Sequence, residues 1–427
     1  MKKKGLIILF TFYSVILFAE VNYSDFFTNK VLRIDLVLSG NKTSQMASVS
    51  QVYEEKQWGG RTTKLDEFHG KGTYKYDLYD LNTGKLIYTD GFSTLFQEWQ
   101  TTDEAENIER SMENTIYAPL PQKDVRFVLV HRVDGLFTDT LLNINLNPEG
   151  EIVRPTETPD SKTKDILISG KTDECIDIVL IAEGYTKYDE KLFFEDAQNF
   201  ADALFTSKPF AENKGKFNIR AVMSYSEEEG VDDPRQDIYV KTALNSSYNT
   251  LYSDRYLMTN DLYDVSNYAS VVPHDQIIIL ANSEKYGGGG IYNFYSINST
   301  RGRKNQQVFI HEFGHSFAGL ADEYYTSDVS YNDFFPADIE PWEPNVTTLV
   351  DFDSKWKDML DQDTPVPTPA KSKYKNTIGV YEGGGYVAKG VYRPYIDCRM
   401  KTNEAEDFCP VCARAIVRTI NFYTKGD

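Results

Sequence analysis

Two histidines and a glutamate at fixed spacing are the residues of this chain best suited to catalysis. Residues 311–325 read HEFGHSFAGLADEYY and contain the pattern H-E-x-x-H as His311, Glu312 and His315. Residues four apart on a helix share one face, about 5–6 Å apart, so both imidazoles can bind one metal ion. Glu312 lies beside them without competing for the metal. This spacing predicts a zinc site in which the glutamate acts as general base for peptide hydrolysis.

The surroundings of the motif favour this reading over an amphipathic helix with two ordinary histidines. An apolar run at 308–310 precedes it, and Gly319 follows His315 where a helix can end in a left-handed turn. A structural zinc site would add cysteines and more histidines, whereas the acidic residues here suit an open catalytic site. Such a site takes three protein ligands and leaves the fourth position for water.

The third ligand cannot be a downstream histidine, because none of the five histidines follows His315. In the pattern H-E-x-x-H-x-x-G-x-x-H the chain turns back after the glycine and supplies the last ligand. The glycine comes one residue later in this chain, so Asp322 is the first choice and Glu323 the second. Glu340 or Glu343 would serve if a second helix supplied the ligand instead.

Three segments together resemble one known family. The motif HEFGHSFAGLADEYY, DIVLIAEGY at 177–185 and CRM at 398–400 are similar to the IgA-peptidase family of secreted zinc metallopeptidases, in the metzincin clan. The resemblance covers nearly the whole chain after its first residues. It implies one catalytic Zn²⁺ and makes Met400 the Met-turn residue beneath the histidines. By its residue type alone, Met400 reads as an ordinary core methionine.

Residues 1–19 have the composition of a signal peptide. Lys2, Lys3 and Lys4 precede the apolar run GLIILFTFYSVILFA, which is short for a membrane span. We expect cleavage near Ala19 and a secreted, periplasmic or cell-surface protein, with an uncleaved N-terminal anchor as the alternative.

The net charge of the chain indicates which classes of molecule it is suited to bind. The net charge of −19 and the pI near 4.8 disfavour nucleic acid and anionic membranes. We expect a protein or glycoprotein substrate and no stable membrane association after signal cleavage. The sequence specifies no oligomeric state.

Four cysteines suit an exported protein with few cross-links. Cys409 and Cys412 form a C-x-x-C pair in a chain without a thioredoxin-like pattern. We therefore expect a disulfide from Cys398 to Cys409 or Cys412. The remaining cysteine of that group would pair with Cys175.

Residues 20–155 are rich in strand patterns and predict a β-sandwich. The segment VLRIDLVLSG at 31–40 alternates apolar and polar residues, as a half-buried strand does. A turn at 82–84 separates two further strand patterns and indicates a hairpin. The Pro/Thr/Ser-rich segment 156–164 reads as a linker.

Residues 165–427 are predicted to form the zinc peptidase domain, which makes the whole chain α+β or mixed α/β. Strand patterns at 176–184, 217–226 and 275–283 alternate with helical ones. The glycines at 287–290 read as a flexible loop near the cleft, where an extended substrate could pair with a strand edge. A closing helix is expected after Cys412. The family resemblance implies a metzincin-like arrangement of these elements.

These predictions describe a secreted zinc endopeptidase in which Glu312 takes a proton from water. A tyrosine hydroxyl would help to stabilise the oxyanion. The candidates are Tyr324, Tyr325, Tyr386, Tyr392 and Tyr395. The alternatives are a protein- or glycan-binding module whose metal domain has narrow or absent activity, and a zinc hydrolase acting on a non-peptide amide.

Overall fold

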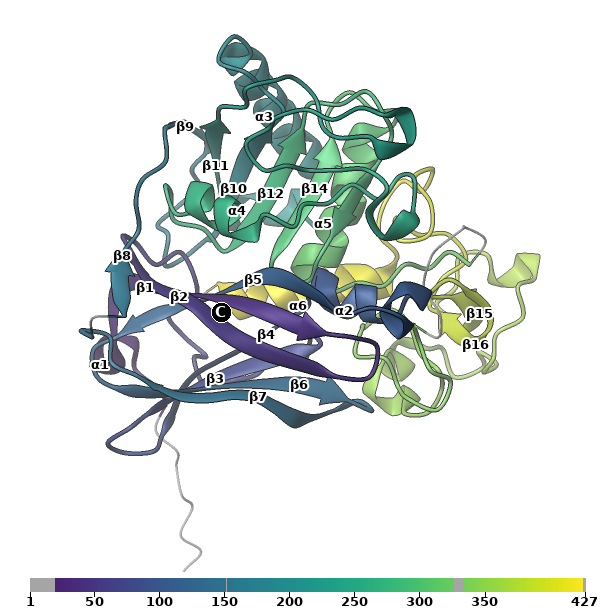
Figure 1. Cartoon of the computed structure of the whole chain (residues 1–427). Helices are drawn as coiled ribbons and strands as arrows, with labels where there is room; N and C mark the ends of the chain where they lie inside the picture. The colour runs from purple at the N-terminus through teal and green to yellow at the C-terminus, as the bar shows by residue number, and fades with distance from the viewer. Residues whose placement is uncertain (1–19, 151, 326–333, 425–427) are drawn as a thin grey trace, which may run out of the picture.

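The chain folds into a mixed α/β structure with a β-rich N-terminal region (Figure 1). A computed structural model describes residues 20–150, 152–325 and 334–424. The predicted signal peptide, 1–19, lies outside the described residues. Within the described ranges, no helix combines the length and the apolar character that crossing a bilayer requires.

Two four-stranded sheets build the N-terminal region, in the orders β5-β1-β2-β8 and β4-β3-β6-β7. The strands of the first sheet are β1 (Phe27–Gly40), β2 (Gln45–Glu55), β5 (Arg110–Pro121) and β8 (Val153–Pro155). Those of the second are β3 (Tyr74–Asp80), β4 (Leu86–Phe92), β6 (Val125–Val133) and β7 (Leu136–Leu146). Short helices α1 (Tyr23–Phe26) and α2 (Leu95–Gln100) accompany them.

The two sheets lie one above the other in Figure 1. The Tyr74 hydroxyl of β3 donates a hydrogen bond of 2.8 Å to Gln45 Oε1 of β2, so the sheets also touch through polar groups. The predicted hairpin with its turn at 82–84 is confirmed, because β3 and β4 pair antiparallel on either side of that turn.

Two polar side chains in the middle of β1, Arg33 and Asp35, are buried, which corrects the expectation of a half-exposed strand. Arg33 and Asp35 form an ion pair at 2.7 Å, and both are almost completely inaccessible. The Arg33 guanidinium also donates to Asn267 Oδ1 at 2.8 Å, on helix α4 (Leu262–Ala269). The face that the alternating pattern assigned to solvent is therefore covered by a helix from the second half of the chain.

A six-stranded sheet in the order β13-β14-β12-β10-β11-β9 forms the second half of the chain. Its members are β9 (Ser161–Leu167), β10 (Ile176–Glu183), β11 (Phe217–Ser224), β12 (Gln276–Ala281), β13 (Gly288–Gly290) and β14 (Tyr295–Ser299). The four inner strands run parallel, and β9 and β13 pair antiparallel at the two edges. A separate hairpin joins β15 (Tyr381–Gly384) to β16 (Val387–Arg393).

The predicted linker, 156–164, is too long at its C-terminal end. Residues from Ser161 onward belong to β9, which pairs with β11. Its side chains from Lys162 to Asp165 are exposed. Polar, charged residues are typical of an edge strand, where they discourage pairing with another chain. The same composition reads as a linker when the sequence is considered alone.

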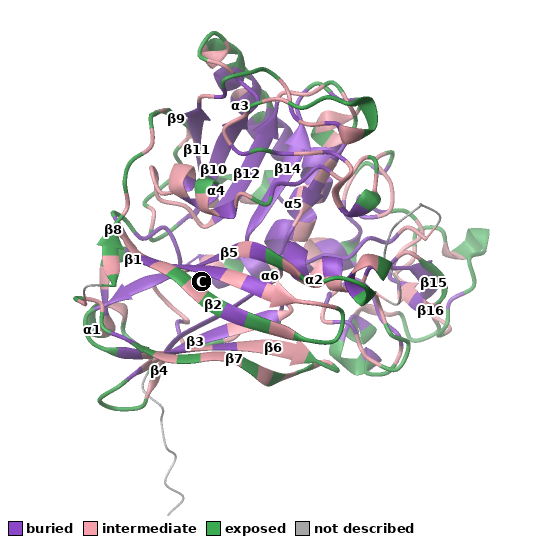
Figure 2. Ribbon diagram, viewed as in Figure 1, coloured by how far each residue is buried: buried purple, intermediate pink, exposed green. Residues whose placement is uncertain are grey.

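The six-stranded sheet is buried on both faces (Figure 2). On one face, Val179 and Ile277 belong to the same hydrophobic cluster as the N-terminal strands. On the other face, Leu180 and Ile278 pack in a second cluster with three helices. These are α3 (Glu190–Leu204), α5 (Asn305–Ala318) and α6 (Pro410–Tyr423). The sheet is thus a middle layer that joins the two halves of the chain into one core.

The expected disulfides are not formed, since all four cysteines are free. The sulfurs of Cys398 and Cys412 lie 3.7 Å apart, whereas an S–S bond measures about 2.05 Å. Cys175 precedes β10, and its sulfur lies 4.0 Å from the carbonyl oxygen of Gly215. The three C-terminal cysteines gather instead around a glutamate.

Candidate metal centre and active site

Helix α5 carries the H-E-x-x-H motif and ends where the sequence predicted. Phe309, Phe313 and Phe317 anchor it in the cluster shared with α3 and α6. The helix stops at Gly319, whose φ of +63° is left-handed and whose N–H bonds to the carbonyl of His315 at 3.0 Å. A β-carbon at Gly319 would also clash with the Trp342 ring at 2.6 Å. This turn sends the chain back past the histidines.

Three ligand atoms converge after that turn. Asp322 Oδ1 lies 3.0 Å from His311 Nε2 and 3.4 Å from His315 Nε2. The two Nε2 atoms are 3.1 Å apart. Ligands on a zinc tetrahedron, at about 2.0–2.1 Å from the ion, are separated by about 3.3–3.4 Å. The spacing of the three atoms therefore fits a shared metal ion.

Both imidazoles are oriented by backbone carbonyls. His311 Nδ1 lies 2.9 Å from the carbonyl oxygen of Arg399, and His315 Nδ1 lies 2.5 Å from that of Leu320. A carbonyl accepts only, so each Nδ1 donates its proton to it, and Nε2 is the nitrogen that can bind a metal ion once it carries no proton. This is the usual support for a metal-binding histidine.

The charges in the group favour a cation. Burial would raise the pKa of Asp322, but the two imidazoles hold it well below its usual range. Burial lowers the pKa of His315, but Asp322 and Glu312 outweigh it and raise this pKa to about 9. Glu312 has a raised pKa, mainly because of burial, which the histidines oppose in part. The ionised carboxylate of Asp322 thus raises the affinity of this point for a proton, and a metal cation can take the place of that proton.

The other acidic candidates have partners of their own or line the cavity that contains the histidines. The backbone N–H of Glu323 donates to the Met400 carbonyl at 2.8 Å, and its carboxylate accepts from Asn345 Nδ2 at 3.0 Å. Glu340 lies 3.7 Å from Lys355 Nζ. Glu343 is buried in the wall of the same cavity as the histidines. His311, Glu312 and His315 form a group that could hold a metal ion, and this group includes none of Asp322, Glu340 and Glu343. Asp322 is favoured among these three because its Oδ1 lies 3.0 Å and 3.4 Å from the two Nε2 atoms.

Met400 packs against the helix between the two histidines. Its side chain is fully buried, and its sulfur lies 2.9 Å from the place where a β-carbon on Gly314 would stand. The glycine inside HEFGH therefore makes room for this methionine.

Two of the five candidate tyrosines line the cavity at the motif. The Tyr386 hydroxyl donates to Asp322 Oδ2 at 2.7 Å. Tyr324 also lines the cavity, and Arg255 Nη2 lies 3.4 Å from its hydroxyl. Tyr392 and Tyr395 pack against the hydrophobic cluster around α5 and α6, and the ring of Tyr325 lies over Gly383.

The cavity has a volume of about 850 Å³, and several of its residues carry no signal in the sequence. Arg255 and Tyr286 lie beside the motif, and both interact electrostatically with Glu312. The N-terminal region supplies Ser93, Gln97 and Arg132 to the same wall. No local pattern marks these residues, because only the packing of the two halves brings them to the motif.

The glycines at 287–290 are not the flexible loop that we expected. Three of them form the edge strand β13, which lies against α5. A β-carbon on Gly288 would lie 3.1 Å from Glu312 Cγ, and one on Gly290 would collide with the Glu312 carbonyl. The run of glycines is thus explained by the close approach of a strand to the motif helix.

Comparison with protein families gives two matches. The family described as IgA Peptidase M64 matches residues 165–376 and 370–420. The family described as Peptidase M64 N-terminus matches residues 22–137. A search of curated proteins finds no match.

Proposed function

The chain belongs to the IgA peptidase M64 family of metallopeptidases, and we propose that it is an exported, zinc-dependent endopeptidase. Its substrates would be extracellular proteins or glycoproteins. We propose His311, His315 and Asp322 as the ligands of one catalytic Zn²⁺. The observation that carries this assignment is the convergence of their ligand atoms, with Asp322 Oδ1 at 3.0 Å and 3.4 Å from the two Nε2 atoms.

Glu312 is the proposed general base. Zinc, when bound, lowers the pKa of a water ligand to about 7 and polarises the scissile carbonyl. Glu312 takes the proton of the attacking water and passes it to the leaving amine. Burial raises the pKa of Glu312, which brings the carboxylate closer to the range in which it can accept and return a proton.

The oxyanion would be stabilised by donors on the cavity wall. Tyr386 is the first candidate, because its hydroxyl already lies beside Asp322. Arg255 and Tyr324, which touch each other nearby, are the next. An extended peptide would lie along β13, whose glycines bring the strand edge close to Glu312.

The proposed architecture follows the family resemblance. Residues 20–155 would form a β-sandwich, and residues 165–427 a metzincin-like domain in which Met400 is the Met-turn methionine. The signal peptide 1–19 would direct export and then be removed. Its removal leaves a secreted, periplasmic or cell-surface enzyme.

The test compares the parent with Glu312→Gln. Both should bind the same amount of zinc by elemental analysis, while the variant cleaves a panel of unfolded proteins and glycoproteins about 10²–10⁴-fold more slowly, the usual contribution of a general base. Glu195→Gln is the control, because Glu195 is an exposed residue of α3 outside the cavity lining. It should retain parental activity.

A second variant, His311→Ala/His315→Ala, identifies the metal. It should hold one zinc ion fewer per chain than the parent. An unchanged zinc content would refute the catalytic site. If the variant loses one zinc ion but the parent cleaves no protein of the panel, the binding-module alternative is favoured.

A further inference from the structure

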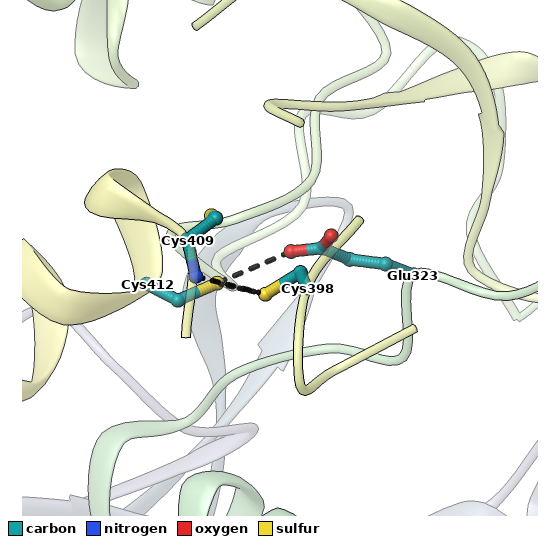
Figure 3. A group of neighbouring side chains, drawn as sticks. All are labelled: Glu323, Cys398, Cys409 and Cys412. Atoms are coloured by element: carbon teal, nitrogen blue, oxygen red, sulfur yellow. Dashed lines mark hydrogen bonds between the residues drawn. The ribbon is translucent and has the colours of Figure 1, made fainter. Parts of the chain in front are cut away.

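A second group of side chains that could hold a metal ion is shown in Figure 3. It consists of Glu323, Cys398, Cys409 and Cys412, and one ligand atom from each lies within 4.8 Å of all the others. All four residues are buried, with relative exposures of 0%, 0%, 3% and 0%. They come from the segment after α5, from the segment ending at Met400, and from the start of α6.

The distances in this group match a zinc–thiolate site. With Zn–S bonds of about 2.3 Å, two sulfurs on a tetrahedron are about 3.8 Å apart. Cys398 Sγ and Cys412 Sγ are 3.7 Å apart, and Cys412 Sγ lies 3.1 Å from Glu323 Oε1. The group therefore has the size of one coordination shell.

Disulfide chemistry accounts for this group less well. Three thiols cannot all pair, and Cys175 lies elsewhere, beside Gly215. Any disulfide within the group would leave one buried thiol facing the buried carboxylate of Glu323. The Oε2 atom of that carboxylate has no hydrogen-bond partner among the residues that the structure describes. An unsatisfied buried carboxylate oxygen is costly, and a metal ion would satisfy it.

Backbone groups beside the sulfurs favour negative charge there. The backbone N–H of Cys409 donates to Cys398 Sγ at 3.2 Å. Cys409 is the N-cap of α6, so Cys409 and Cys412 lie at the positive end of the helix dipole. Three sulfurs and one oxygen in a closed, buried shell are a donor set that favours zinc over magnesium or calcium.

We propose that Glu323, Cys398, Cys409 and Cys412 bind a second, structural zinc ion. This ion would tie together three segments that support the catalytic site. Glu323 directly follows Asp322 and bonds to the Met400 carbonyl. Arg399, next to Cys398, provides the carbonyl that orients His311. The structural ion thus holds in place the third ligand, the methionine and one imidazole.

The experiment uses the full mature chain and counts zinc by elemental analysis. The parent should hold two zinc ions per chain and His311→Ala/His315→Ala one. Cobalt added to that His variant after metal removal should give a thiolate-to-cobalt charge-transfer band. This variant leaves the cysteines intact, so the proposal can be tested even if cysteine variants fail to fold.

Cysteine variants complete the test. Cys398→Ser/Cys412→Ser should lose one zinc ion and the cobalt band, whereas Cys175→Ser, the matched control, should keep both. The proposal is overturned if the His variant holds no zinc and gives no band. It is equally overturned if the intact mass shows two hydrogens lost to a disulfide within the group.

Discussion

Two adjacent acidic residues face two proposed metal-binding groups that differ in donor atoms and in access to solvent. Asp322 joins two imidazoles at the wall of a cavity of about 850 Å³. Glu323 joins three sulfurs in a shell that is closed to solvent. Nitrogen and oxygen donors with an open position suit catalysis, whereas a closed sulfur-rich shell suits structure. Access to solvent, more than proximity in the sequence, separates the two roles.

Chelation gives the largest expected difference between the groups. A chelator added to the native enzyme should remove the cavity ion and reduce cleavage below detection, because a metal supplies several kcal/mol of transition-state stabilisation. Zinc should restore activity. The ion in the cysteine group should leave only with denaturant, measured as zinc release together with thiol titration. Release of both ions at the same rate would contradict the comparison.

Replacing Asp322 and Glu323 separately should distinguish an effect on catalysis from an effect on stability. Asp322→Ala should lower kcat/KM roughly 10³-fold, since it removes a ligand of an ion that supplies several kcal/mol. Glu323→Ala should lower the free energy of unfolding by about 3 kcal/mol or more, the range reached when a metal site is lost. Peptide cleavage and urea denaturation measure the two effects. Equal loss of stability in both variants would show that the two groups are not distinct.

The hydroxyl of Tyr386 allows a finer test of the cavity group. Tyr386→Phe removes the hydrogen bond to Asp322 Oδ2 and should lower activity or zinc affinity about 10–100-fold. Tyr392→Phe is the control, because that ring packs outside the cavity and should leave both unchanged. Zinc titration and kinetics on one peptide substrate distinguish affinity from turnover. No change in either quantity would remove Tyr386 from the site.

The smallest effect is expected at Lys71, a residue of the N-terminal region that contacts the end of the motif helix. Lys71 Nζ donates to the carbonyl of Ala318 at the end of α5 and to Thr419 Oγ1 on α6, both at 2.9 Å. Lys71→Met should lower the free energy of unfolding by about 1–3 kcal/mol, the cost of leaving buried partners unpaired. Zinc content should not change.

This contact also predicts a pH dependence. Burial, aided by Arg418, lowers the pKa of Lys71 to about 7 from 10.5. Between these values the unfolded chain binds more protons, so the free energy of unfolding contributed by Lys71 rises with pH. Urea denaturation at pH 7 and pH 9 should show a larger gain for the parent than for Lys71→Met. A smaller gain for the parent would contradict the buried contact.

The motif helix could be predicted from sequence because its signals are local. H-E-x-x-H, the apolar residues before it and Gly319 lie within one helix and its turn. Whether Asp322 or Glu323 faces the histidines depends on how the chain runs after the turn, which spacing left open. The glycines of β13 are visible in the sequence, but their cause is a tertiary contact with α5, which the sequence does not show.

Predictions from the sequence were wrong where one residue pattern can have two different physical causes. Arg33 and Asp35 alternate with apolar residues as solvent-facing side chains do, yet they form a buried pair under α4. The polar residues at 161–164 suit a linker and an edge strand equally well. Disulfides were predicted because the sequence does not reveal that Glu323 lies close to Cys412.

The wall formed by Ser93, Gln97 and Arg132 makes the shape of the cavity depend on both halves of the chain. Substitutions at these residues would reshape the cavity without changing His311, Glu312 or His315. A fragment of residues 165–427 alone would lose this wall and also the strands against which Val179 and Ile277 pack.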